Sequence, residues 1–450
     1  MPRTLAVTRV EVAVVGGGLV GLGVARDLAL RGVETGLFEA GGLCAGASGR
    51  NHGLLHSGAR YAVGDPGAAA ECASENVLLR RLAAPYVVPC GGLVVATSAQ
   101  EEEYLDRLGA AMSELGIPSA EARRDAVWLP HWCRAVSTND AAIDPFGVAL
   151  ACAAQAMECG AEMHLERVVD FADGRVSTAG GEEHHADAVV LACGWEDGLL
   201  RRILPGAPAL SPDRGTMVVT ERRLHPQVVG RARPPADGDL VVPSGHASIV
   251  GTTSSPGTDI QPTPQDVDRL LDEAAALFPQ VREARLLRAY TGVRPLLGDA
   301  GGRLASRGHR ILVGDGVVAA LGGKLTTFRL MAQEAADAAC EMLGHNGRGT
   351  TDRKPLPDLT GQRQSGEAGC GCEGGGLRLP EPLLPLLGPA PHRFGGTGFG
   401  PCQGLRCLAL SPDPRTAARE RWRGLRAVIY RGQLAQGYLL WARERSARGR

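Results

Sequence analysis

The sequence predicts an α/β fold in which a domain built on a parallel β-sheet carries an inserted, antiparallel β-rich domain. Residues 10–39 read as a strand, a glycine-rich turn, a helix and a second strand. A fully apolar run at 188–195 is typical of a parallel strand that is buried on both faces. Short strand-like segments at 92–96, 216–220 and 248–252 differ in character and indicate a second, antiparallel sheet.

The composition is that of a large globular chain. Its 450 residues include 48 basic and 49 acidic side chains, a balance that argues against nucleic-acid binding through bulk charge. Among the basic residues only Lys324 and Lys354 are lysines. The 62 glycines are nearly twice the usual share of ~7 %, yet 44 % apolar residues exclude a disordered chain. No uncharged apolar stretch reaches the ~18 residues that span a bilayer, so we expect a cytoplasmic protein.

The first element is a strand at 10–15, followed by Gly16-Gly17-Gly18-Leu19-Val20-Gly21 and a helix over 22–31. A second strand at 34–38 ends in Glu39. Glycine-rich chains produce a lone G-x-G-x-x-G by chance, but here the flanking elements and the acid are those of a Rossmann-like dinucleotide site.

Each residue of this motif has a physical role. Gly16 allows the tight turn, Gly18 lets the backbone approach a pyrophosphate, and Gly21 lets the helix pack on the strand. Glu39 accepts hydrogen bonds from ribose hydroxyls and disfavours the 2′-phosphate of NADP. The glycines do not separate FAD from NAD.

Three later elements follow the same logic. Strands at 310–314 and 317–321 flank Asp315-Gly316, which predicts a hairpin, and a helix opens at Gly322 and continues to about residue 343. A further helix is predicted over 264–278, with Thr263 as N-cap and Pro264 at its first position.

The stretch 49–61, Gly-Arg-Asn-His-Gly-Leu-Leu-His-Ser-Gly-Ala-Arg-Tyr, carries the most chemistry. It places two histidines, two arginines, an asparagine and a tyrosine among small residues directly after the nucleotide-binding unit. A polar surface loop is the alternative that composition alone leaves open.

This stretch, together with other segments, resembles the FAD-dependent glycerol-3-phosphate dehydrogenase family. The resemblance rests on residues 47–63, 239–243, 251–254, 287–296 and 322–329, in that order, and is strongest to the large (A) subunit of the anaerobic enzymes. It implies an FAD-binding domain of the glutathione-reductase/D-amino-acid-oxidase type with an inserted substrate domain. It also implies oxidation of sn-glycerol 3-phosphate to dihydroxyacetone phosphate, with hydride passing to flavin N5.

The resemblance assigns site residues by motif. The cofactor-binding residues that it implies are Gly16, Gly18, Gly21, Glu39, Ser48, Asn51, Gly194, Gly322, Gly323, Leu325 and Thr326. The substrate-binding residues are Arg60, Tyr61, Arg294, Arg307 and Lys324, and the catalytic ones are His56, Arg294 and Lys324. Guanidinium groups suit a phosphate because each donates two parallel charge-assisted hydrogen bonds. His56 is the candidate base, with a packed neutral histidine as the alternative, and His52 is expected to be structural.

Four cysteines crowd into the C-terminal region as C-x-C and C-x4-C: Cys370, Cys372, Cys402 and Cys407. They resemble the bacterioferritin-associated-ferredoxin-like [2Fe–2S] module of the same large subunits, and four thiolates are what such a cluster requires. The 29 residues between Cys372 and Cys402 are crowded with proline and glycine, which departs from that module. A zinc site and unliganded thiols are the alternatives.

The family implies partners for electron transfer, namely companion flavin and iron–sulfur membrane-anchor subunits, with a quinone acceptor. The tail at 411–450, with ten arginines and three acidic residues, is expected to dock on such partners, on anionic lipid or on its own domain. We expect an oxidoreductase region at 1–345, a linker at 346–369, the cysteine module at 370–410 and this tail. Within the first region, nucleotide-binding parts are expected at about 1–80, 145–205 and 300–345, and the substrate domain at about 81–144 and 206–299.

Two other functions compete with this interpretation. A related flavoenzyme that oxidises a 2-hydroxy acid or an amine needs only one or two cations for a carboxylate. A non-catalytic electron-transfer subunit needs no substrate-binding cations at all.

Overall fold

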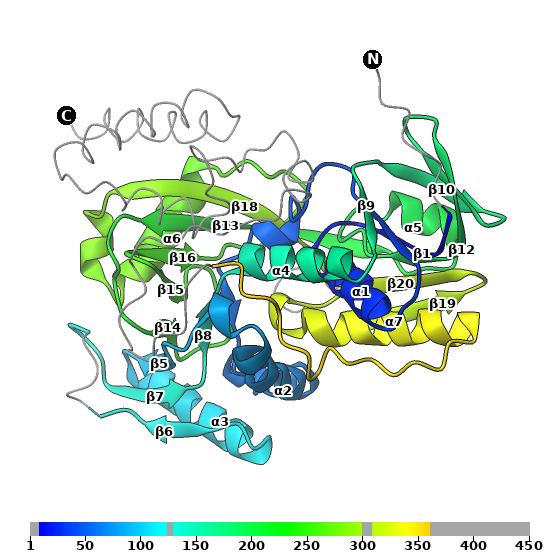
Figure 1. Cartoon of the computed structure of the whole chain (residues 1–450). Coiled ribbons are helices and arrows are strands. Elements are labelled where there is room, and N and C mark those ends of the chain that lie inside the picture. The colour runs from blue at the N-terminus through cyan, green and yellow to red at the C-terminus, as the bar shows by residue number, and fades with distance from the viewer. Residues whose placement is uncertain (1–8, 124–128, 299–307, 361–450) are drawn as a thin grey trace.

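The computed structural model describes residues 9–123, 129–298 and 308–360 (Figure 1). Arg307, the four C-terminal cysteines and the basic tail therefore lie outside the described residues. Within the described ranges, no helix is long and apolar enough to cross a membrane.

An eight-stranded sheet holds the nucleotide-binding motif. At its centre the described chain forms parallel pairs in the order β9, β2, β1, β12 and β20, as the apolar run at 188–195 predicts. β19 forms the expected hairpin with β20, and β10 and β11 extend the sheet beyond β12. The strands are β1 (Arg9–Val15), β2 (Thr35–Phe38), β9 (Glu162–His164), β10 (Val168–Ala172), β11 (Arg175–Thr178), β12 (Glu183–Leu191), β19 (His309–Gly314) and β20 (Val317–Gly322).

Helices α1 (Leu19–Leu30), α4 (Pro145–Glu158) and α7 (Phe328–Leu343) pack together against one face of this sheet (Figure 1). The short helix α5 (Gly198–Ile203) contributes Leu200 to the core on the other side of the sheet. Asp144 caps the start of α4 through two backbone N–H groups, and Gly344, at φ +73°, ends α7.

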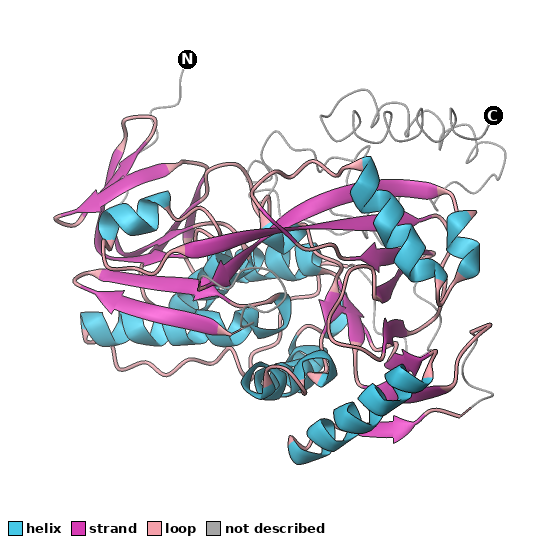
Figure 2. Cartoon of the chain, turned by 180° about the vertical axis from the view of Figure 1, so that it is seen from behind, coloured by secondary structure: helices cyan, strands magenta, loops and turns pink. Residues whose placement is uncertain are grey.

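A second large sheet, of nine strands, is built from two separate parts of the described chain, residues 92–138 and 210–297 (Figure 2). Its longest pairing joins β13 and β18 in antiparallel register, and helix α6 (Pro264–Ala275) packs its apolar side on the sheet. Thr263 caps α6 in a capping box with Asp266. The strands are β5 (Gly92–Ala96), β6 (Ser119–Glu121), β7 (Arg134–Thr138), β13 (Leu210–Thr220), β14 (Val228–Arg231), β15 (Leu240–Ser244), β16 (Ala247–Gly251), β17 (Ser255–Pro256) and β18 (Leu286–Leu297).

A small third sheet contains β3 (Leu54–Leu55), β8 (Ala141–Ile143) and β4 (Val87–Val88), in that order. The remaining α-helices of the described chain are α2 (Pro66–Leu82) and α3 (Ala99–Glu114). β3 matters most for function, because it leads directly into His56.

Several boundaries differ from the sequence prediction. α1 begins at Leu19 rather than 22, because Gly18 already serves as its N-cap. The predicted helix at 264–278 ends at Ala275 and is followed by a 3₁₀ turn at Pro279–Arg282. The predicted helix at Gly322 starts as a 3₁₀ turn at Leu325–Thr327 and becomes α-helical at Phe328, because Gly322 and Gly323 both have positive φ.

Residues 345–360, whose composition predicts the start of a linker, pack along α1 and α2. Thr351 donates to Asp27 Oδ2 at 2.6 Å, and the Lys354 carbonyl accepts from the buried Arg26 at 2.6 Å. Leu356 and Leu359 are buried in the core beneath α1 and α4. We call residues 345–360 the strap.

Candidate functional site

The glycine turn between β1 and α1 leaves no room for side chains. A Cβ on Gly16, whose φ is +112°, lies 2.4 Å from the Ala192 carbonyl oxygen, and one on Gly21 lies 1.9 Å from the Gly16 carbonyl oxygen. Gly18, the N-cap of α1, supplies no capping side chain. No side chain of the N-cap residue therefore competes for the backbone N–H groups of the first turn of α1, an arrangement that suits a pyrophosphate.

Glu39 and Ser48 line the same turn. Glu39 Oε2 accepts from the Gly17 N–H at 2.7 Å, and its Oε1 accepts from the N–H groups of Gly41 and Gly42 at 2.7 and 3.1 Å. Ser48 Oγ accepts from the Leu19 N–H at 2.9 Å and lies 3.1 Å from where a Cβ on Gly18 would stand. The side-chain-free backbone at Gly18 and the Glu39 carboxylate at the end of β2 fit a dinucleotide with free ribose hydroxyls.

The other residues assigned to the cofactor lie on loops that approach this turn or His56. Asn51 stabilises its own loop, since its side chain accepts from the Gly53 N–H at 2.8 Å and donates to the Ser48 carbonyl at 2.8 Å. Gly194 follows β12 at φ +64°, while Gly322 and Gly323 turn the chain after β20 at φ +76° and +77°. Leu325 and Thr326 begin the 3₁₀ turn that precedes α7.

Three side chains from distant segments hold the backbone around His56. The Asn76 amide donates to the Leu55 carbonyl at 3.0 Å, and Thr326 Oγ1 accepts from the His56 N–H at 3.0 Å. Asp140 Oδ1 accepts from the Ser57 N–H at 2.6 Å. The position of the buried His56 imidazole is therefore fixed through its main chain.

His56, Tyr61 and Lys324 form one cluster. The Tyr61 hydroxyl lies 3.5 Å from His56 Nε2, and the two rings are 5.1 Å apart between centroids. Lys324 Nζ lies 5.3 Å from the centre of the Tyr61 ring, within range of a cation–π interaction. His52 contacts His56 edge to face, with 6.0 Å between ring centroids. An imidazole, a phenol and an ammonium group thus converge on one place.

Arg60 is held by Asp239, which lies 179 positions away. Its Nη1 and Nη2 donate to the two carboxylate oxygens at 3.1 and 2.9 Å. Burial by itself lowers the pKa of the Arg60 guanidinium, but the Asp239 charge outweighs it and raises that pKa above the ordinary value. The guanidinium is therefore a permanent cation in a fixed orientation.

Arg294 has a comparable partner across the nine-stranded sheet. It stands opposite Asp213 in the β13–β18 register, and its guanidinium donates to Asp213, Thr252 Oγ1 and the Thr253 carbonyl. The Asp213 side chain is 1 % exposed. Arg294 is thus a second guanidinium held rigidly by a buried carboxylate.

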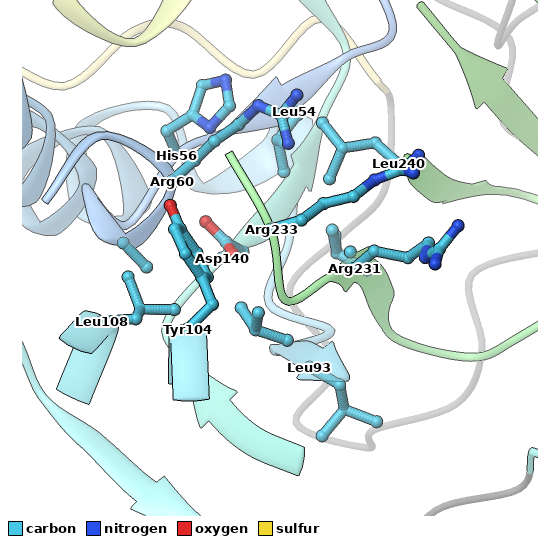
Figure 3. A pocket seen from close by; sticks show the side chains of 14 residues that line it. Leu54, His56, Arg60, Leu93, Tyr104, Leu108, Asp140, Arg231, Arg233 and Leu240 are labelled. Carbon is cyan, nitrogen blue, oxygen red and sulfur yellow. The ribbon is translucent and has the colours of Figure 1, made fainter. Parts of the chain in front are cut away.

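A pocket opens beside Arg60, lined also by His56, Asp140, Tyr104, Arg231 and Arg233 (Figure 3). Its cations have acidic partners: Arg231 pairs with Glu101, and Arg233 with Glu273 at 2.9 Å. The pocket therefore combines charges of both signs around His56 and Arg60.

Sequence reasoning missed the residues that hold the predicted ones. Asp239 and Asp213 hold two of the arginines, while Asp140 and Asn76 hold the backbone beside His56. One signal was present, since Asp239 opens a segment that carries the family resemblance.

The family described as FAD dependent oxidoreductase matches residues 11–338. In Haemophilus influenzae, the A subunit of anaerobic glycerol-3-phosphate dehydrogenase is 36 % identical over 386 residues, covering 79 % of this chain and 68 % of that protein. The protein of the same name from Escherichia coli K12 is 36 % identical over 379 residues, covering 77 % and 70 %.

Solved structures share the fold. The L-alpha-glycerophosphate oxidase of Mycoplasma pneumoniae superimposes with a TM-score of 0.64 at 19 % identity, covering 78 % of this chain and 99 % of that one. Glycine oxidase of Geobacillus kaustophilus reaches 0.65 at 23 % identity, covering 78 % and 99 %.

Proposed function

Because the chain belongs to the FAD-dependent oxidoreductases, and within them to the glycerol-3-phosphate dehydrogenase family, we propose that its own reaction is the oxidation of sn-glycerol 3-phosphate to dihydroxyacetone phosphate. The observation that carries the proposal is the convergence of His56, Tyr61 and Lys324 in a chain whose glycine turn fits a dinucleotide. FAD, when bound, supplies the acceptor for the hydride equivalent that leaves the second carbon of the substrate.

In this proposal the residues of the turn hold the cofactor. The first turn of α1, with Gly18 as its N-cap, faces the pyrophosphate, and Glu39 shares its carboxylate with the ribose hydroxyls. We also assign Ser48 to the cofactor, because it already contacts the N-terminus of α1. The backbone around Gly322 and Gly323 is assigned to the cofactor as well.

The substrate phosphate is assigned to the fixed cations. Lys324 contributes a point charge beside Tyr61, while Arg60 and Arg294 contribute guanidinium groups whose orientations Asp239 and Asp213 fix. Charge-assisted hydrogen bonds of this kind suit a phosphate better than a single carboxylate. Arg307 is assigned to the same phosphate on the resemblance alone, because it lies outside the described residues.

His56 is assigned to the proton of the substrate's second hydroxyl. A neutral imidazole accepts that proton while Tyr61 orients the hydroxyl, and Lys324 and Arg294 stabilise the negative charge that develops on the oxygen. The buried main chain around His56 keeps this acceptor in one position.

Electron transfer onward is the finer part of the proposal. We assign a [2Fe–2S] cluster to Cys370, Cys372, Cys402 and Cys407, with partner subunits and a membrane quinone as the later acceptors. The support is the four-cysteine pattern and the name of the relatives, which are A subunits. Iron and acid-labile sulfide in equal amounts in anaerobically purified protein would support the cluster, and zinc without sulfide would contradict it.

The decisive experiment is anaerobic reduction of the protein's own flavin. The visible absorption of FAD should bleach on addition of sn-glycerol 3-phosphate and stay unchanged with lactate, glycine or the opposite enantiomer. Bleaching by a hydroxy acid or an amino acid alone would favour the competing flavoenzyme function, and no bleaching by any substrate would favour an electron-transfer subunit.

A further inference from the structure

Helix α2 has a buried face that carries polar side chains. Cys72, Glu75 and Asn76 are all buried on it, with Glu75 only 2 % exposed. Charged and amide side chains are buried at a cost unless they have specific partners, so these partners are informative.

Asn76 contacts the segment that carries His56. Its side-chain amide donates to the Leu55 carbonyl at 3.0 Å, and Leu55 directly precedes His56 in the chain. Leu55 lies at the end of β3, a strand of two residues that has little pairing of its own. The Asn76 hydrogen bond therefore helps to fix the point from which the His56 side chain extends.

Glu75, the neighbouring residue, contacts the segment that carries Lys324. Its two carboxylate oxygens accept from Arg329 Nη2 at 2.5 Å and Arg329 Nε at 2.8 Å, and the same guanidinium donates to Gln333 at 2.6 Å. Arg329 lies in the first turn of α7, five positions after Lys324. One turn earlier on α2, burial raises the pKa of the Cys72 thiol, and the charge of Lys324 partly offsets that increase.

We propose that α2 is a positioning element that sets the separation of His56 from Lys324, with Asn76 and Glu75 as positioning residues for the two segments. The two segments meet directly where the His56 N–H donates to Thr326 Oγ1 at 3.0 Å. The α2 contacts, between positions 21 and 254 apart in the sequence, add a second constraint that holds each segment from the other side. A bidentate carboxylate–guanidinium pair fixes orientation as well as distance, and an apolar pair of the same size would hold the core equally well without doing so.

The expected effect on catalysis rests on the proposed function, whereas the positioning of the two segments by α2 does not. The first measurement is therefore hydrogen–deuterium exchange of the full-length holoprotein, which needs no substrate. The variants are Asn76→Ala and the apolar pair Glu75→Leu with Arg329→Met, which keeps the volume buried. The control is Ser74→Ala, on the exposed side of the same helix. We expect faster exchange confined to residues 54–61 in the first variant and to residues 323–329 in the second.

The second measurement separates positioning from stability. With thermal stability close to the wild type, kcat/KM for glycerol 3-phosphate should fall by about 10- to 100-fold in both variants, since a displacement near 1 Å has that effect. Arg329→Lys keeps the charge but loses the two parallel hydrogen bonds of the guanidinium, so its kcat/KM should lie between that of the wild type and that of the apolar pair. Ser74→Ala should match the wild type.

Each outcome bears on one proposal only. Exchange that rises across the whole chain, or stays unchanged at both segments, overturns the positioning role of α2. If exchange rises locally but wild-type flavin is not bleached by glycerol 3-phosphate, the positioning stands and the proposed function fails.

Discussion

At the scale of single residues, two of the three arginines that the sequence singles out, Arg60 and Arg294, are held by carboxylates. Arg60 is fixed by Asp239 and Arg294 by Asp213, and both aspartates are buried. Removing either carboxylate would take the charged partner from a half-buried guanidinium group, which is destabilising. Lys324 has a different setting, against an aromatic face and a thiol, and this makes it the better residue to test.

Lys324→Ala should lower kcat/KM for glycerol 3-phosphate by about 10- to 100-fold, because one charge-assisted hydrogen bond contributes roughly 1.5–3 kcal/mol. Lys324→Arg, which keeps the charge, should lose less. Steady-state kinetics with matched FAD content measures both. Unchanged activity in the alanine variant would contradict the role assigned to Lys324.

His225 gives a pH-dependent prediction that is independent of catalysis. The residue is 2 % exposed, its Nδ1 accepts from the Gln227 N–H at 3.2 Å, and its Nε2 has no hydrogen-bond partner within the described residues. Burial lowers the pKa of His225, so below the ordinary pKa of about 6.5 the unfolded chain binds the proton more readily. Stability should therefore fall as the pH drops from about 6.5 toward the lower folded-state pKa.

His225→Leu should remove this part of the pH dependence. Urea unfolding at pH 7.5 and at pH 5.5 should show a smaller loss of unfolding free energy in the variant, the difference being at most about 1.4 kcal/mol for each pH unit. Equal losses in both proteins would show that His225 binds a proton equally well in the folded and unfolded states.

At the scale of elements, the β1–α1–β2 unit tolerates no side chain at Gly21, because Gly21 in α1 lies against the Gly16 carbonyl. Gly21→Ala should displace α1 from the turn, lower the FAD content of purified protein and lower the thermal midpoint. Gly109→Ala is the matched control, because Gly109 lies within α3 with nothing within 4 Å of a Cβ. That variant should keep its FAD and gain about 0.5–1 kcal/mol. Equal FAD content in the two variants would contradict the assigned turn.

The elements also show what the sequence predicts and what it does not. Glycines, an N-cap and apolar periodicity located β1, α1, β2 and α6, because these signals act within a few residues. Asp-Pro pairs also mark the starts of α2 and α4 in the sequence, since Asp65 and Asp144 cap these helices and Pro66 and Pro145 begin them. The Arg60–Asp239 pair was not predictable, because only the folded chain brings positions 179 apart together. The eight cysteines scattered between positions 44 and 340 look from the sequence like small core residues, and for Cys133 and Cys159, which are exposed, this prediction is wrong.

At the scale of the whole molecule, both large sheets contribute to the site. Lys324 follows β20 of the eight-stranded sheet, Arg294 lies on β18 of the nine-stranded sheet, and His56 follows β3 of the small sheet. The strap connects the helices on the eight-stranded sheet with the segment beside the small sheet. The Tyr86 hydroxyl beside β4 donates to the Pro357 carbonyl at 2.6 Å and accepts from the Leu359 N–H at 3.0 Å.

The strap should be part of the folded oxidoreductase rather than a dispensable tether. A chain that ends after Thr360 keeps the strap, whereas one that ends after His345 exposes the core that Leu356 and Leu359 cover. It also removes one hydrogen-bond partner each of Arg26 and Asp27, namely the Lys354 carbonyl and the Thr351 hydroxyl. Exposing each buried leucine side chain costs about 1.5–3 kcal/mol, and each lost hydrogen bond costs about 0.5–1.5 kcal/mol.

We therefore expect the chain ending after Thr360 to unfold cooperatively, to retain FAD and to bleach with glycerol 3-phosphate. The chain ending after His345 should unfold at a markedly lower temperature or fail to accumulate. Thermal unfolding and flavin absorbance of both truncations, beside the full chain, measure this. If both truncations are equally stable, the strap contributes nothing to the fold. If the Thr360 truncation alone loses FAD, residues beyond 360 are needed for the cofactor, and the site extends past the part of the chain that the structure describes.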